Sequence, residues 1–121
     1  MAEEESGKPY DLELRTELFA KRVRAFVKHL ARTDCNVIDC RQLIRSSGSV
    51  AGNYIEANEA LGRKDFLMKI RTCRKEAKES GLWARLLDVN GNGAFEMERA
   101  AIAQEARELM NIFGAILRKS E

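Results

Sequence analysis

The segment from Phe66 to Leu87 carries apolar or small residues at alternating steps of four and three positions. The residues at these steps are Phe66, Ile70, Cys73, Ala77, Ser80, Ala84 and Leu87. Such steps keep side chains on one face of a helix, as in the seam of a helical bundle. The small residues in the middle of the series indicate that a neighbouring helix approaches closely. The spacing therefore predicts a helix over 64–88 whose inner face packs against another helix.

The preceding segment is the expected neighbour. Residues 37–60 have helical periodicity and two glycines, Gly48 and Gly52, one turn apart. Glycine costs about 1 kcal/mol relative to alanine inside a helix, so we expect these two to permit close backbone contact, with a kink as the alternative. This places the seam near Gly48–Gly52 and Ala77–Ser80. The short link at Gly62 makes the helices antiparallel, with Gly62 expected in the left-handed conformation that ends a helix.

Two further helices complete the predicted domain. Phe19, Val23, Phe26 and Leu30 mark a helix over 11–32 with Asp11 as its N-cap, and Asn36 is expected to cap the next helix. Apolar residues from Phe95 to Ile116 predict the last helix over 94–118. Residues 1–10 are predicted to be a disordered tail. Short links then give an all-α, up-down-up-down four-helix bundle over 11–119.

The basic residues are unevenly distributed along the chain. The net charge is only +2, but residues 15–78 hold 15 Lys or Arg against 7 Asp or Glu. A basic surface attracts anionic partners such as nucleic acids, although ordinary solvated helix faces would have the same composition. The candidate phosphate contacts are Arg15, Arg22, Lys28, Arg63, Lys64, Lys69, Arg71, Arg74, Lys75 and Lys78.

Carboxylates on the two central helices raise the question of a metal site. Di-metal bundle sites need Glu-x-x-His pairs, and the single histidine, His29, stands in no such motif. No nucleophile–base pair is evident either, so we expect no metal, no cofactor and no enzymatic activity. A polar network between helices is the favoured interpretation, with both glutamates solvated as the alternative. Its expected members are Arg45, Asn53, Glu56 and Glu76.

The segment Asp-Val-Asn-Gly-Asn-Gly at 88–93 imitates the start of a calcium-binding loop. Asp88, Asn90 and Asn92 stand at the first, third and fifth positions of such a loop. The twelfth position, which requires a bidentate glutamate, is Arg99. The segment is therefore predicted to be a turn between helices rather than a calcium site.

Three motifs resemble a known family. They are R-S-S-G-S-V-A-G-N-Y-I-E-A at 45–57, K-D-F at 64–66 and K-E-A-K-E-S-G-L-W-A-R-L-L at 75–87. They are similar to bacterial four-helix-bundle proteins first described as products of intervening sequences in large-subunit ribosomal RNA genes. The accessory variability-determinant proteins of diversity-generating retroelements belong to the same group. Residues that match the family pattern are Arg45, Ser49, Asn53, Glu56 and Glu76, whereas Ala51 replaces a proline of many relatives.

The resemblance implies a ring-like homopentamer, and nucleic-acid binding in the retroelement branch. Together with the basic segment it predicts a non-enzymatic oligomeric bundle that binds RNA or DNA backbones with little sequence specificity. The alternative is a protein-interaction or scaffold module, for example an accessory protein of a reverse transcriptase. No apolar run is long enough to span a membrane, and the acidic, polar start is unlike a signal peptide, so a cytoplasmic location is expected.

Overall fold

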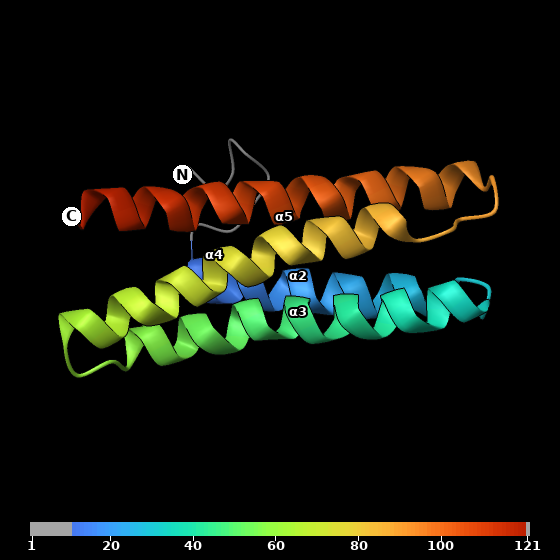
Figure 1. Cartoon of the computed structure of the whole chain (residues 1–121). Helices are drawn as coiled ribbons and strands as arrows, with labels where there is room; N and C mark the ends of the chain where they lie inside the picture. Colours follow the sequence, from blue (N-terminus) through green and yellow to red (C-terminus); the bar gives the residue numbers. More distant parts are fainter. Residues whose placement is uncertain (1–10, 121) are drawn as a thin grey trace.

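The computed structural model describes residues 11–120, which form four helices and no strand. These are α2 (Leu12–Val27), α3 (Asp34–Asn58), α4 (Arg63–Leu86) and α5 (Gly93–Lys119). Successive helices run in opposite directions, and α2 closes the bundle against α5 (Figure 1). The predicted all-α, up-down-up-down bundle is confirmed. The tail predicted at 1–10 lies outside the described residues.

Helix α2 begins where the sequence predicts and ends earlier. The Asp11 side chain accepts hydrogen bonds from the backbone N–H groups of Glu13, at 2.9 Å, and Leu14. At the other end, the N–H of Leu30 bonds the carbonyl of Val27, which tightens the chain into a turn. Leu30 remains buried although it lies beyond the helix. Its apolar spacing therefore reflects a turn that covers the core, and the predicted helix to residue 32 is wrong.

The loops around α3 and α4 differ from prediction in two residues. Thr33, not Asn36, caps α3 by accepting the N–H of Asn36 at 3.1 Å. Gly62 has an extended conformation (φ −141°) and is the N-cap of α4, so the expected left-handed helix end is wrong. The only positive φ values described are at Asn90 and Gly91, in the turn before α5.

Helices α3 and α4 meet through small side chains. The hydroxyl oxygens of Ser46 and Ser80 are 2.8 Å apart and fully buried, and the Cys73 thiol contacts the carbonyl of Val50 at 3.6 Å. The predicted small-residue face of α4 is therefore present. Its partner face on α3 is rotated away from the glycines.

The two glycines do not serve the contact expected of them. A Cβ at Gly52 would meet nothing within 4 Å, and one at Gly48 would meet the Arg24 side chain of α2. At 100° per residue, Gly48 lies 200° from Ser46, which points at α4. The prediction that both glycines permit close approach of α4 is wrong, and Ser46 and Val50, on the opposite side of α3 from Gly48, perform that role.

The turn predicted at 88–93 uses its polar atoms to hold the backbone. The carboxylate of Asp88 accepts the N–H of Asn90 at 2.8 Å, and Asn92 caps α5 by accepting the N–H of Phe95 at 2.9 Å. Arg99 reaches back and donates to the carbonyl of Leu87 at 2.6 Å. The residue at the twelfth loop position thus ties α5 to the end of α4. None of the helices between residues 11 and 120 is long and apolar enough to cross a bilayer.

Candidate nucleic-acid interface

Two of the cations predicted on α2 form ion pairs with α5. Arg15 forms a bidentate ion pair with Glu105 of α5, at 2.8 and 2.9 Å, and contacts Glu108 at 3.0 Å. Arg22 pairs with Glu98 of α5 in the same way, at 2.6 and 2.8 Å. The hydrogen bond from Arg22 lowers the pKa of Glu98 below its ordinary value, against a smaller opposing effect of burial. These arginines fasten α2 to α5, and their charge is largely compensated.

Two other predicted cations also lie apart from the rest. The ammonium of Lys69 pairs with Glu56 at 2.8 Å, and this hydrogen bond raises the pKa of the lysine. Lys28 lies at the end of α2, at the rim of a different hollow described below. Neither residue lines the hollows that the remaining predicted contacts form.

The six remaining predicted cations lie together on α4. They line three hollows: one of about 380 Å³ along the start of α4, and two of about 470 and 230 Å³ between α4 and α5. The first and second hollows share Arg71, and the second and third share Lys78, so they form one continuous groove. We call it the α4–α5 basic groove, with the following cations: Arg63, Lys64, Arg71, Arg74, Lys75, Lys78, Arg85, Arg107 and Arg118.

Three of these groove cations were missed by the sequence analysis. Arg85, Arg107 and Arg118 fall in the part of the chain whose overall composition is acidic. The signal that could have identified Arg107 and Arg118 is spacing, because positions 107, 114 and 118 share one stripe of α5. Figure 1 shows α4 beside α5 where α4 ends and α5 begins, and the two helices are neighbours in the bundle.

The groove is basic because the acidic residues of both helices point elsewhere. On α4, Glu76 and Glu79 face α3, where they meet Arg45. On α5, Glu98 and Glu105 face α2. Among residues 11–120, no carboxylate lines the three hollows or forms an ion pair with the nine groove cations. A row of cations without counter-charges produces a positive potential that attracts an extended polyanion.

Glycines let arginine side chains lie flat on the floor of the groove. A Cβ at Gly114 would stand 3.3 Å from Nη1 of Arg118 and 3.8 Å from Nε of Arg74. A Cβ at Gly81 would stand 3.0 Å from Nη1 of Arg85. The missing side chains therefore leave room that the guanidinium groups occupy.

The predicted polar network forms between α3 and α4 with one change in membership. Arg45 pairs with the buried Glu76 at 3.2 Å. Glu76 also accepts the hydroxyl of Ser49 at 3.3 Å, and Asn53 donates to that hydroxyl oxygen at 2.9 Å. Glu56 is exposed and pairs with Lys69 instead, so its assignment to the network is wrong.

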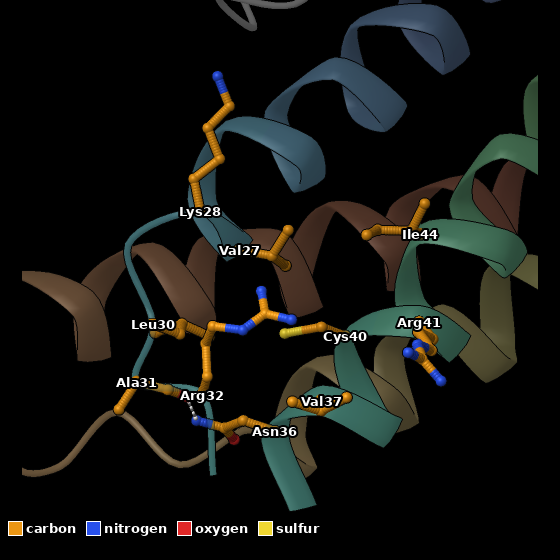
Figure 2. Close-up of a pocket in the computed structure, with 10 residues that line it drawn as sticks. All are labelled: Val27, Lys28, Leu30, Ala31, Arg32, Asn36, Val37, Cys40, Arg41 and Ile44. Carbon is orange, nitrogen blue, oxygen red and sulfur yellow. Dashed lines mark hydrogen bonds between the residues drawn. The ribbon is translucent and has the colours of Figure 1, made fainter. Parts of the chain in front are cut away.

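A separate apolar hollow of about 260 Å³ lies between the end of α2 and the start of α3 (Figure 2). Val27, Leu30 and Ile44 contribute apolar surface, and the Arg32 side chain turns toward Cys40 across it. Burial, with the charge of Asp39, raises the pKa of the Cys40 thiol. A raised pKa suppresses the thiolate, so this cysteine is poorly suited to nucleophilic chemistry. Within residues 11–120, no cluster of three His, Cys, Asp or Glu side chains is arranged to hold a metal ion.

Comparison with known proteins gives one informative similarity. No family model matches the chain, and no curated protein does. The structure is similar to the crystal structure of a protein of unknown function from the S23 ribosomal protein family of Bacteroides thetaiotaomicron, with a TM-score of 0.76 and 25% sequence identity. The similarity covers 88% of this chain and 98% of that one. It supports a relationship of this chain to small, all-helical bacterial proteins.

Proposed function

We propose that this chain is a non-enzymatic helical-bundle protein that binds the phosphate backbone of RNA or DNA through the α4–α5 basic groove. The observation that carries the proposal is a continuous groove whose nine cations face no carboxylate of the described chain. Contacts to phosphate provide affinity without reading bases. No aromatic side chain lines the three hollows, so base stacking does not add specificity there. Binding is therefore expected to depend strongly on salt and weakly on sequence.

The test is fluorescence anisotropy with unrelated RNA and DNA oligonucleotides over a range of salt concentrations. The triple variant Arg71→Gln/Arg74→Gln/Lys78→Gln removes three groove charges. The matched control Lys21→Gln/Arg32→Gln/Arg41→Gln removes three exposed charges elsewhere. Each lost phosphate contact lowers the salt slope by about 0.9 for duplex DNA, so the groove variant should lose about 2 to 3 units of slope. Absence of binding at low salt, or equal losses in both variants, would exclude the groove as the interface.

Self-association is part of the same proposal, because the resemblance to the intervening-sequence and retroelement proteins implies a homopentamer. An apolar patch supports it. Ile38 lies two helical turns from Arg45, and Leu86 lies two turns from Glu79. Because Arg45 and Glu79 form an ion pair between α3 and α4, Ile38 and Leu86 lie on the same face of the bundle as that pair. Both side chains are about half exposed. Trp83, beside this patch, has a buried indole N–H without an acceptor among the described residues. Light scattering tests the assembly, and a strict 13.7 kDa monomer contradicts it.

The same patch favours a second candidate function, a protein-interaction module such as an accessory protein of a reverse transcriptase. Exposed Ile38, Leu82 and Leu86 would supply an apolar contact surface. A cytoplasmic location fits both candidates and is proposed with them. Direct binding to a reverse transcriptase encoded in the neighbouring genes, lost in Leu82→Ser/Leu86→Ser but kept in the triple groove variant, would favour this function over nucleic-acid binding.

A further inference from the structure

Two arginines from different helices converge above a glycine in the middle of the α4–α5 basic groove. Arg74 comes from α4 and Arg118 from α5, and both approach the position that a Cβ of Gly114 would occupy, at 3.8 and 3.3 Å. Gly114 itself is buried beneath them. The hollow above this point has a volume of about 470 Å³ and is lined by no acidic residue. Two guanidinium groups thus share one open space.

The local charge of this space is uncompensated within residues 11–120. Neither Arg74 nor Arg118 forms an ion pair with a described carboxylate, in contrast to Arg15, Arg22, Arg45 and Arg99. Arg71, Lys75 and Lys78 line the same hollow and add positive charge. Neighbouring like charges repel each other, and an anion bound between them removes that repulsion. The arrangement is therefore suited to an anion that carries more than one negative charge.

We propose that Arg74, Arg118 and the gap above Gly114 form a seat for a phosphate monoester, supplied by the terminal phosphate of a nucleic-acid strand. The identity of this donor rests on the proposed function. A guanidinium group offers parallel N–H donors that match two oxygens of one phosphate. A terminal monoester presents three free oxygens and a charge of about −1.5 to −2 at pH 7. An internal phosphodiester presents two free oxygens and a single charge, so the two arginines favour a strand end over the strand interior.

The experiment compares one oligonucleotide in 5′-phosphorylated and 5′-hydroxyl forms by competition anisotropy, with inorganic phosphate as a third ligand followed by NMR. The wild type is expected to bind the phosphorylated form at least threefold more tightly. Arg74→Gln and Arg118→Gln should abolish this preference. Gly114→Leu should abolish it too, because the new side chain fills the seat without changing the charge.

Two matched controls separate a discrete seat from diffuse charge. Lys64→Gln removes the same charge from another part of the groove, and Gly52→Leu makes the same replacement where a Cβ meets nothing within 4 Å. Both should keep the threefold preference, although Lys64→Gln weakens both forms equally. Equal binding of the two forms by the wild type would overturn the seat, as would equal loss of preference in Lys64→Gln and Arg74→Gln.

The seat and the proposed function fail in distinguishable ways. If both oligonucleotides bind equally, nucleic-acid binding stands and the seat is overturned. If neither oligonucleotide binds, the proposed function fails, and the NMR titration with inorganic phosphate then tests the seat by itself. Shifts confined to the Gly114 amide and the Nε–H groups of Arg74 and Arg118 would then support it, and unchanged spectra would overturn it.

Discussion

Asn36 at the start of α3 and Asp88 after α4 exchange two hydrogen bonds across one end of the bundle. The carboxamide of Asn36 donates to the carbonyl of Asp88 and accepts its N–H, both at 2.9 Å. The same carboxamide donates to the carbonyl of Ala31 at 3.1 Å. Asn36 itself is only 2% exposed. One buried side chain therefore joins both loops at this end.

Replacement of Asn36 by alanine is expected to lower the free energy of unfolding by about 2 kcal/mol, because it removes three hydrogen bonds made by a side chain that is itself buried. Urea denaturation followed by circular dichroism measures the change. The control is Asn111→Ala at an exposed position of α5, expected to change stability by less than about 0.5 kcal/mol. A loss below that value in Asn36→Ala would show that the loops do not depend on this side chain.

The buried pair Ser46 and Ser80 is expected to behave as one unit. Each single change to alanine leaves the other hydroxyl without its 2.8 Å partner, at a cost of about 1 kcal/mol. The double variant should cost clearly less than the sum of the two, since neither hydroxyl then remains. A double-mutant cycle by chemical denaturation measures this coupling. Strict additivity would mean that the two hydroxyls do not depend on each other.

The sequence predicted the helices of this bundle better than the faces that they present to one another. The seam of α4 could be predicted because its steps of four and three continue through Cys73 and Ser80, both fully buried. The direction that Gly48 and Gly52 face was predicted wrongly, because a glycine has no side chain whose chemistry indicates whether it points to a neighbouring helix or to solvent. Glu56 was placed wrongly for a related reason: it is exposed, although Ala57 at the next position of α3 is buried.

The groove was half predictable. Its α4 side followed from the density of cations between residues 63 and 78. Its α5 side was hidden because residues 79–121 hold 5 basic and 7 acidic residues, an average over two faces of opposite charge. Arg15 and Arg22 contribute to the positive charge of residues 15–78. The glutamates that compensate their charge, however, lie 76 to 93 positions further along the chain, on α5. Such pairs depend on which helices are neighbours, and composition does not contain that information.

The Arg22–Glu98 pair predicts a specific pH dependence. The pKa of Glu98 in the folded protein is lowered from its ordinary 4.5, mainly by the hydrogen bond from Arg22. The folded state therefore binds this proton less readily than the unfolded state, and the pair's stabilisation is complete above the unfolded pKa. It is lost as the pH falls through the lowered folded pKa. The magnitude should be small, about 0.5 to 1 kcal/mol, because both side chains are partly exposed.

Arg22→Gln should raise the pKa of Glu98 toward 4.5, which NMR titration of the side-chain carboxyl measures directly. The stability difference from wild type should be constant above about pH 5 and shrink in more acidic solution. Lys21→Gln, which breaks only the exposed pair with Glu17, should leave the Glu98 titration unchanged. An unshifted Glu98 in Arg22→Gln would show that the arginine does not stabilise its charge.

The thiols of Cys73 and Cys35 are expected to differ sharply in reactivity. Burial raises the pKa of Cys73 to about 12, and the side chain is fully enclosed between α3 and α4, whereas Cys35 is exposed. The thiolate is the reactive form, so iodoacetamide should alkylate Cys35 rapidly at pH 8 and leave Cys73 unmodified until the bundle opens. Peptide mass spectrometry after timed labelling measures both sites in one sample, with protein unfolded in urea as the control in which the two rates converge. Asn36→Ala, by lowering the cost of opening, should accelerate labelling of Cys73 without changing that of Cys35. Equal rates for the two cysteines in the native wild type would contradict the close contact of α3 and α4 that encloses Cys73.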